Sequence, residues 1–391
     1  MNKNRAIYFI ILLGLVSLFS DMTYEAARSI SGPYLSFLGA SAVAVGFAGG
    51  FGEFAGYSLR FLSGWLADKI KTYWAFIISG YALSLFAVPA LALVHSWKLA
   101  VILLVLERLG KALRTPARDT LLSYATFRIG RGLGFGIHEA LDQVGAVGGP
   151  LLIALVFYLK GGYREAFSVL LIPALIALSL LIVARKLFPM PQDFELSPKR
   201  IYVLESKGFP RSYFLYLIAM GFFGAGFIDF ILIGFHLERA GLIPREHIPL
   251  LYALAMGIDA LFALILGYLL DRIGLKAVFL GIFLDLFAVP LIFLGKLTLL
   301  IVLGIIFWGI GLASQESIIR AYIAELVPAE RRAEGYGLFS AVFGISWFVG
   351  SLFMGLLYEV SPGSLVVLSL VLHAVSLLLL SGNAPLVRLT D

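Results

Sequence analysis

Three ionisable residues with helical spacing lie near the start of the chain, inside an apolar stretch. Asp21, Glu25 and Arg28 are four and three positions apart, so their side chains share one stripe of an α-helix. Asp21 lies about 21 Å along that helix from Ile7, near its middle. A carboxyl group shielded from water can hold a proton near neutral pH. The stripe therefore predicts proton or cation binding, or alternatively a buried Glu25–Arg28 ion pair that fixes packing.

A histidine and two acidic residues lie together in a second apolar segment. His138 and Asp142 share one helical face, with Glu139 beside them. Imidazole titrates near neutral pH, so this grouping is suited to a proton relay. A metal site that also uses Glu53 is the alternative, but the chain has no cysteine and five histidines, which argues against a soft metal. We therefore expect no metal and no cofactor.

A third cluster contains an arginine about 15 Å from the outer end of its segment, near the midplane. This residue is Arg108, and its neighbours Glu107 and Lys111 have the spacing of a helical ion pair. Such a pair would leave Arg108 to attract a carboxylate of the first segment or an anionic substrate. Alternatively, Arg108 pairs permanently with Glu107 or Asp142 as a structural clamp. The spacing leaves both interpretations open.

The segments that hold these residues are long enough to cross a membrane. The chain is 60% hydrophobic and 14% charged, whereas ordinary soluble domains are roughly a quarter charged. A β-barrel is excluded because its strands are short and alternate in polarity. Helices of about 20 apolar residues span the hydrocarbon core. Twelve such segments are predicted: 6–37, 42–66, 73–95, 98–122, 132–159, 165–186, 212–237, 247–270, 275–294, 297–321, 333–358 and 363–381.

Charge distribution predicts the orientation and the domain organisation. Of the thirty lysines and arginines, twenty fall on the inner side if both termini are inside, six fall in outer loops and four lie within segments. Cytoplasmic loops retain basic residues, so both termini are expected inside. The same rule accounts for the net charge of +6 without a nucleic-acid partner. A polar, proline-containing stretch at 187–211 separates a half at 1–186 from a half at 212–391.

Two related inner turns indicate an internal repeat. GWLADKIK at 64–71 and GYLLDRIGLK at 267–276 are six segments apart. We expect their acidic residues to bond to neighbouring helix N-termini and hold the inner side closed. The residues predicted to act in gating or conformational change are Gly64, Asp68, Lys69, Gly148, Gly149, Pro150, Asp271, Arg272, Glu316 and Arg320. Two further acidic residues, Asp229 and Asp259, stand alone in their segments.

The paired turns resemble the loop signature of the major facilitator superfamily. The first copy matches over GWLADK and departs at Lys71, Thr72 and Tyr73, where the family has glycine and then two basic residues. Arg108, Gly110 and Arg114 are similar to the arginine-containing motif of the fourth helix. The run ERLGKALRTPARD at 107–119 resembles a group of archaeal and bacterial members. Gly145 with GGP at 148–150 incompletely resembles a motif of the drug/proton antiporter branch.

The resemblance implies two pseudo-symmetric six-helix bundles around a central cavity that opens alternately to each side. It also places helices 3, 6, 9 and 12 against lipid, where the sequence is poorest in ionisable residues; segment 9 carries Asp285 and segment 12 carries His373. We expect a cell-membrane transporter that acts as a monomer on a small molecule and protons. Asp21 or Glu25 would bind a proton or a cationic substrate, but not both, and Arg108 would tune them.

Other functions fit the same residues. An organic-anion symporter or uniporter would use Arg108 and Arg28 as ligands, with the carboxylates as counter-charges. Outside transport, a lipid flippase or an intramembrane enzyme could share such a hydrophobic fold. The chain has no G-x-x-x-x-G-K-[ST] loop for nucleotide phosphates and no catalytic constellation outside the membrane. We therefore expect no enzyme activity and no ATP-driven pumping.

Overall fold

The computed structural model describes residues 3–126, 130–191, 208–327 and 331–383, and within these ranges it contains helices and no strand. The chain forms two compact units. Unit 1 contains residues 1–38, 55–200 and 245–253, and unit 2 contains residues 39–54, 201–244 and 254–391. The helix of residues 42–70 thus contributes its first part to unit 2 and its second part to unit 1.

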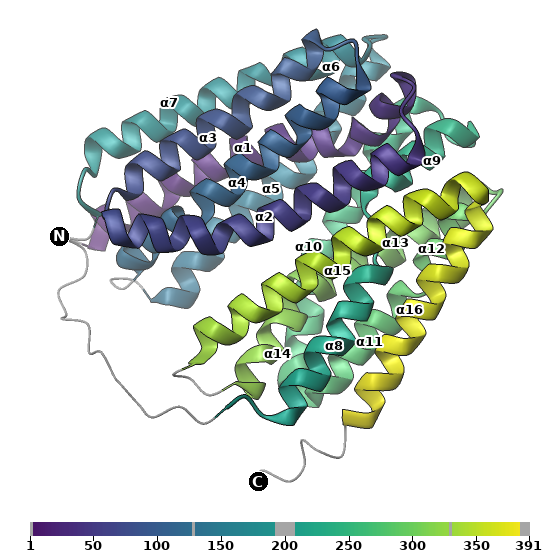
Figure 1. Cartoon of the computed structure of the whole chain (residues 1–391). Coiled ribbons are helices and arrows are strands. Elements are labelled where there is room, and N and C mark those ends of the chain that lie inside the picture. Colours follow the sequence, from purple (N-terminus) through teal and green to yellow (C-terminus); the bar gives the residue numbers. More distant parts are fainter. Residues whose placement is uncertain (1–2, 127–129, 192–207, 328–330, 384–391) are drawn as a thin grey trace. The chain divides into compact units, whose positions relative to one another are not determined.

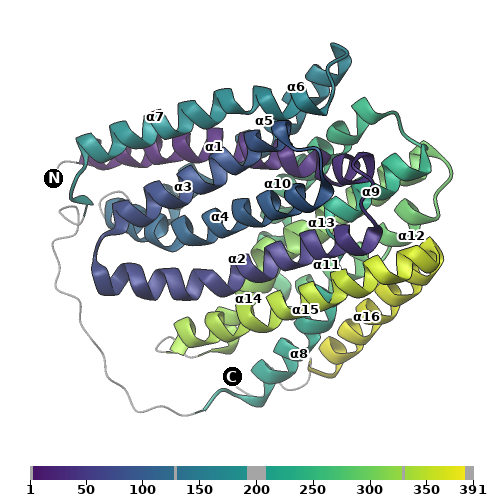
Figure 2. The same ribbon diagram turned by 45° about the horizontal axis from the view of Figure 1, so that its top comes forward.

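Unit 1 is built from helices that run alongside one another in both ribbon views (Figures 1 and 2). The helix α1 packs against α5 and α7, and α3 packs against α4. The elements are α1 (Lys3–Phe37), the second part of α2 (Ala42–Ile70), α3 (Tyr73–Ala90), η1 (Leu91–Leu93), α4 (Trp97–Thr126), α5 (Arg131–Tyr158), α6 (Tyr163–Val169), α7 (Leu171–Leu187) and η3 (Arg245–His247).

Unit 2 has shorter helical pieces. The helix α8 packs against α15 and α16, and α12 packs against α13. The elements are the first part of α2, α8 (Arg211–Gly226), α9 (Phe230–Ala240), α10 (Ile248–Ile273), α11 (Leu275–Asp285), α12 (Ala288–Phe293), α13 (Thr298–Ala313), the π-helix η4 (Ser314–Ile318), α14 (Ile319–Leu326), α15 (Arg332–Val360) and α16 (Pro362–Asn383). The first residues of α10 belong to unit 1.

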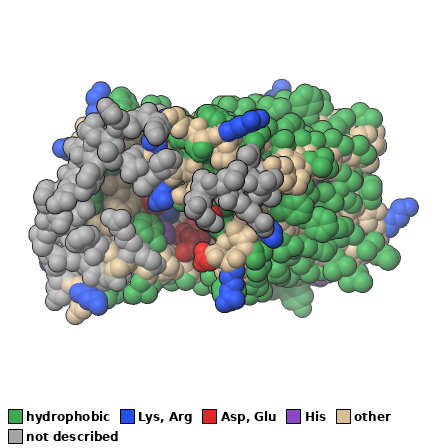
Figure 3. Space-filling model, turned by 90° about the horizontal axis from the view of Figure 1, so that it is seen from below, with side chains coloured by type: hydrophobic (Ala, Val, Ile, Leu, Met, Phe, Trp, Pro, Cys, Tyr) green, Lys and Arg blue, Asp and Glu red, His purple; other side chains and the backbone are tan. Residues whose placement is uncertain are grey.

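The number of membrane-crossing segments agrees with the twelve predicted. Among the described residues, ten helical segments are long and apolar enough to cross a membrane. The helices α2 and α4, of 29 and 30 residues, are also long enough to cross the hydrocarbon core. Large hydrophobic side chains are exposed along the helices, and they cover much of the face in Figure 3. Such a surface is suited to lipid and not to water.

Four predicted segments are interrupted, which the sequence prediction missed. Segment 165–186 consists of α6 and α7, and segment 275–294 consists of α11 and α12. A proline lacks the N–H that would bond to the carbonyl four residues earlier. Pro173 lies four residues after Val169, where α6 ends, and Pro290 lies four residues after Leu286, which follows α11. Segment 212–237 breaks between α8 and α9, and segment 297–321 contains the π-helix.

Candidate transport site

Two glycines of α5 allow α5 to approach α1 closely, beside the stripe of Asp21, Glu25 and Arg28. A Cβ atom on Gly145 would lie 2.2 Å from the carbonyl oxygen of Leu18, and one on Gly149 would lie 2.3 Å from that of Met22. These positions therefore admit no side chain. The same Cβ on Gly145 would lie 3.1 Å from the Cβ of Asp21. The backbone contact thus sets the position of Asp21 against α5.

The predicted glycine motif is only partly a packing motif. A Cβ on Gly148 would have the Met22 Cε atom 3.9 Å away as its neighbour, which is an ordinary contact. Gly148 therefore has room for a side chain, unlike Gly145 and Gly149. Gly145 and Gly149, four residues apart, make the contact because they share the face of α5 toward α1. Pro150 is buried within α5.

Both carboxyl groups of the first stripe are buried in unit 1. Asp21 is 7% exposed and Glu25 is 8% exposed. The Tyr252 hydroxyl, from the start of α10, donates a hydrogen bond to Glu25 Oε2. Four charged groups act on the Asp21 carboxyl, Asp142 most strongly, and then Lys111, Arg114 and Glu25. Arg28 lies partly buried on the same helix.

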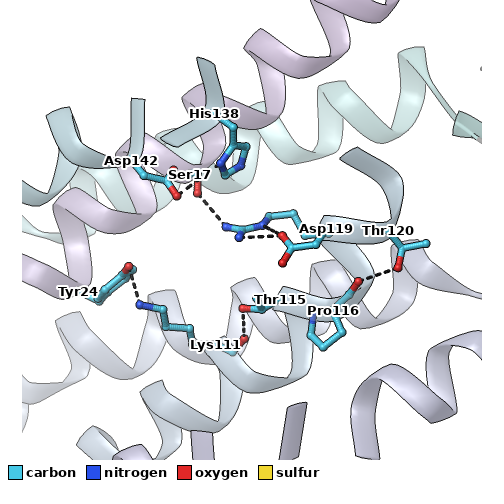
Figure 4. A network of polar contacts seen from close by, with 10 residues as sticks. Ser17, Tyr24, Lys111, Thr115, Pro116, Asp119, Thr120, His138 and Asp142 are labelled. Carbon is cyan, nitrogen blue, oxygen red and sulfur yellow. Dashed lines mark hydrogen bonds and ion pairs between the residues drawn. The ribbon is translucent and has the colours of Figure 1, made fainter. Parts of the chain in front are cut away.

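The basic residues of α4 face this stripe and the adjacent aromatic rings. Lys111 Nζ donates to the Tyr24 hydroxyl at 2.7 Å and lies 3.9 Å from the centre of that ring (Figure 4). Arg114 is 1% exposed and stacks 3.9 Å over the Tyr81 ring of α3. Its Nε and Nη1 atoms meet no hydrogen-bond acceptor among the described residues. Lys111 and Arg114 therefore contact tyrosine side chains directly and act on the Asp21 carboxyl through their charge.

A close approach of α3 and α4 makes the burial of Arg114 possible. A Cβ on Gly80 would lie 2.7 Å from the Gly110 carbonyl oxygen and 2.7 Å from the Arg114 Cβ. A Cβ on Gly110 would lie 2.6 Å from the Ser84 backbone nitrogen. Because neither glycine has a side chain, the two helices approach closely and Arg114 enters between them.

Arg108 is paired with its sequence neighbour. Its Nε atom lies 3.4 Å from Glu107 Oε2, and the two side chains are 11% and 6% exposed. Glu107 therefore contacts Arg108, and Lys111 contacts Tyr24, in place of the Glu107–Lys111 pair considered from the spacing. Of the two interpretations of Arg108, a charge available to a carboxylate or substrate and a structural clamp with Glu107, this geometry favours the clamp. Arg108 is also engaged in further interactions.

The histidine and aspartate of α5 are brought together as their spacing predicts. His138 Nδ1 lies 3.5 Å from Asp142 Oδ2, and the side chains are 4% and 14% exposed. Ser17 of α1 faces Asp142 and accepts a hydrogen bond from Arg118 Nη1 at 3.0 Å (Figure 4). Arg118 is in turn held by Asp119, with Nη2 to Oδ1 at 2.9 Å. Glu139 is exposed, and its charge also acts on Asp142.

Three predicted acidic residues, Asp229, Asp259 and Glu53, lie in unit 2. Asp229 accepts a hydrogen bond from the Ile231 backbone nitrogen at 2.8 Å and thereby caps α9. Asp259 is 3% exposed within α10, and Glu53 is partly buried in the first part of α2. No group of three or more histidine, aspartate or glutamate side chains suited to a metal ion occurs in the described part of the chain.

The predicted gating residues lie at the ends of α2 and α10, within α5, and in η4 and α14. Lys69 stacks 4.8 Å over the Trp65 ring, and Arg272 stacks 4.6 Å over the Tyr268 ring. A Cβ on Gly64 would lie 3.2 Å from the Cβ of Pro116. The remaining positions are an exposed Asp271, an exposed Glu316 in the π-helix and a partly buried Arg320 in α14. The side chain of Asp68 lies outside the described residues.

Five residues around Asp21 and Asp142 were not among the predicted site residues: Ser17, Lys111, Arg114, Arg118 and Tyr252. Lys111, Arg114 and Arg118 follow Arg108 at intervals of three or four residues, so they share its helical face. That spacing was a usable signal. Ser17 and Tyr252 had no such signal, because their partners lie on other helices. A cavity of about 770 Å³ near Lys71, Trp74, Arg185 and Lys186 is lined by none of these residues.

The sequence model of the Major Facilitator Superfamily matches residues 10–242 and 212–388. The chain belongs to this superfamily. An uncharacterized protein of Mycobacterium tuberculosis is 40% identical over 379 residues, covering 95% of this chain and 92% of that protein. An uncharacterized MFS-type transporter of Methanocaldococcus jannaschii is 28% identical over 380 residues, covering 94% of this chain and 93% of that protein.

Solved transporter structures share the fold. A peptide transporter, POT, crystallised in complex with sulfate, superposes with a TM-score of 0.75 at 15% identity, and the alignment covers 99% of each chain. At this identity the likeness shows the fold and not the cargo. Membership of the superfamily makes this chain a multi-pass transport protein of the cell membrane and not an enzyme.

Proposed function

We propose that the protein is a proton-coupled antiporter that exports a small cationic molecule, with Asp21 as the group that exchanges proton for cargo. The observation that carries this proposal is the burial of Asp21 with Asp142 as its strongest charged neighbour. Two nearby carboxyl groups removed from water disfavour double ionisation, so the pair binds a proton readily. A cationic substrate can replace that proton, and competition for one site produces antiport.

The surrounding residues would serve this exchange in distinct ways. Glu25 is held by the Tyr252 hydroxyl and offers a second carboxylate one helical turn from Asp21. His138 contacts Asp142 and is placed to pass a proton to that carboxyl group. Arg108 and Glu107 neutralise each other, so Lys111 and Arg114 replace Arg108 as the cations that balance Asp21.

The conformational cycle belongs to the same proposal. We take residues 1–186 and 212–391 as the two halves that rock about a site between the bilayer faces, joined by the linker 187–211. The inner-turn residues Asp68 and Asp271 would stabilise the state closed to the inside. The close contact at Gly149 would keep α1 and α5 moving as one body.

An anion carrier is the second candidate, and one observation favours it. Arg114 is 1% exposed and has two nitrogen atoms without an acceptor among the described residues. Lys111, on the same helical face, bonds to the neutral hydroxyl of Tyr24. Two cations without a carboxylate hydrogen-bond partner suit an anionic substrate group. In this function the ligands would be Lys111 and Arg114 and not Arg108, which contacts Glu107.

Reconstitution in sealed liposomes distinguishes the two functions. A pH-sensitive dye inside the vesicles would report proton movement on addition of cationic, neutral or anionic compounds. Antiport predicts a pH change on addition of a cation, lost in Asp21→Asn and retained in Glu246→Gln, which changes an exposed carboxylate in η3. Uptake of an anion without a pH change, lost in Arg114→Ala, would replace the proposal with the anion carrier.

A further inference from the structure

A second buried pair of ionisable residues lies within unit 2, in segments that the sequence places against lipid. Asp285 ends α11 and His373 lies within α16. His373 Nε2 lies 2.8 Å from Asp285 Oδ2, and the two side chains are 1% and 2% exposed. A pair this dry is costly to bury unless its hydrogen bonds are complete. Its proton content can therefore be deduced from its hydrogen bonds.

The backbone fixes one proton on the imidazole ring. His373 Nδ1 lies 2.8 Å from the Ser369 carbonyl oxygen, one helical turn earlier. A carbonyl oxygen accepts and cannot donate, so Nδ1 carries a hydrogen. The nitrogen that faces Asp285, Nε2, is then bare in a neutral ring and protonated in a charged one.

The carboxyl group must supply or share the next proton. With a bare Nε2 and an ionised carboxylate, two acceptors would face each other at 2.8 Å. Moving the ring proton from Nδ1 to Nε2 instead would set Nδ1 against the Ser369 carbonyl oxygen. The contacts at His373 Nδ1, His373 Nε2 and Asp285 Oδ2 are satisfied when one additional proton lies between Asp285 Oδ2 and His373 Nε2, whichever atom holds it. Asp285 Oδ1 is buried without a hydrogen-bond partner among the described residues, which further disfavours an ionised carboxylate.

The other neighbours of the pair carry no charge. A Cβ on Gly311 of α13 would lie 2.1 Å from Asp285 Oδ1, and a Cβ on Gly226 of α8 would lie 2.7 Å from His373 Nδ1. The Phe223 ring packs edge-on against the imidazole with 5.4 Å between centroids. Among the described residues, His373 is the one ionisable side chain that acts on Asp285. Neither α8 nor α13 supplies a counter-charge that could replace the shared proton.

The pair lies beside the break between α8 and α9. Ser369, whose carbonyl oxygen contacts His373 Nδ1, also donates its hydroxyl to the Gly226 carbonyl oxygen at 2.9 Å. Trp308 Nε1 donates to the Ile228 carbonyl oxygen at 2.8 Å. Backbone groups freed by a helix break in a membrane need such partners. The position of α16 at His373 therefore bears on how the break is stabilised.

We propose that Asp285 and His373 form a buried binding site for one proton, and that this proton holds α16 in place against the broken helix α8–α9. The site is separate from the proposed exchange of a proton at Asp21. It keeps its proton in the folded protein at neutral and mildly alkaline pH, where the unfolded chain progressively loses its last proton at these two residues.

The proposal fixes the sign of a pH dependence. In an unfolded chain aspartate loses its proton near pH 4 and histidine near pH 6.5. Above about pH 6.5 the folded site then binds one proton more than the unfolded chain, so folding stability falls as pH rises. One proton corresponds to a tenfold change in the unfolding equilibrium constant per pH unit, as long as the folded site remains protonated.

Asp285→Asn tests the proposal, because the asparagine amide can donate to a bare Nε2 without the additional proton. The unfolding equilibrium of the full chain would be measured in detergent between pH 7 and pH 8.5. The ratio of the wild-type constant to the Asp285→Asn constant should rise about tenfold per pH unit. His236→Gln changes the other buried histidine of unit 2, which bonds to Tyr358, and should keep the wild-type slope. A ratio that is constant with pH would overturn the proposal.

A second measurement covers the case in which Asp285→Asn does not fold. In wild-type protein labelled with ¹⁵N-histidine, the ring signals absent from His373→Gln belong to His373. These signals should show a proton on Nδ1 and stay unchanged from pH 6 to pH 8.5. A shift to a ring protonated on Nε2 alone, or an ordinary titration near pH 6.5, would refute the one-proton site.

Discussion

Replacing Gly145 or Gly149 by alanine should destabilise unit 1 and displace Asp21, whereas Gly148→Ala should not. The added methyl groups would lie 2.2 Å and 2.3 Å from the carbonyl oxygens of Leu18 and Met22. A backbone oxygen cannot rotate away as a side chain can, so α1 and α5 would have to separate by about 1 Å.

The magnitude follows from two opposing effects. Alanine is favoured over glycine within a helix by about 1 kcal/mol. Overpacking costs about 1–3 kcal/mol, and a clash with the backbone belongs at the upper end. The net loss at either contact glycine is then about 2 kcal/mol, whereas Gly148→Ala keeps the gain of about 1 kcal/mol. We therefore expect a difference of about 3 kcal/mol between Gly149→Ala and Gly148→Ala.

Unfolding of the purified variants in mixed micelles, titrated with a denaturing detergent, would measure that difference. Gly148→Ala is the matched control, because it adds the same methyl group to the same helix one residue away. Gly145→Ala should also weaken proton-linked transport, since its methyl group would lie 3.1 Å from the Cβ of Asp21. Equal stability of the three variants would refute the account of how α1 and α5 approach.

The same unfolding measurement checks three further variants. Asp229→Ala removes the cap of α9 and should cost about 1 kcal/mol. Trp308→Phe leaves the Ile228 carbonyl oxygen without its donor and should cost about 1–3 kcal/mol. Because both changes affect one helix break, their double variant should depart from additivity, whereas strict additivity would argue that the two contacts are independent. Tyr252→Phe removes the hydrogen bond to Glu25 and should cost about 1.5–3 kcal/mol, and no loss would show that Glu25 has another partner.

The sequence predicted the fold well because the membrane imposes a simple rule. Each crossing needs about 20 apolar residues, and such runs are visible without any knowledge of packing. The interruptions were missed because the hydrophobicity of an apolar run does not differ between a continuous helix and a broken one. Pro173 and Pro290 were the available signals for two breaks, but the break at Asp229 depends on donors from α13 and α16 that lie far away in the sequence.

The candidate site was predictable within a helix and not between helices. The contact of His138 with Asp142 follows from a spacing of four residues on one helix. The partner of Lys111 did not follow, because Glu107 satisfies the same spacing whereas the observed contact is with Tyr24 of α1. The pairing of Asp285 with His373 likewise joins residues 88 positions apart. Spacing restricts which residues share a face, but packing selects their partners.

The proposal that Asp21 exchanges proton for cargo is tested most directly by measuring transport in Asp21→Asn with and without a proton gradient. With a substrate found in the liposome screen, two modes would be compared: accumulation driven by a pH gradient, and exchange of labelled for unlabelled substrate without a gradient. If Asp21 is the exchange site, Asp21→Asn should lose gradient-driven accumulation, while the wild type and Glu246→Gln retain both modes. Gradient-driven accumulation that persists in Asp21→Asn at the wild-type rate would contradict the account.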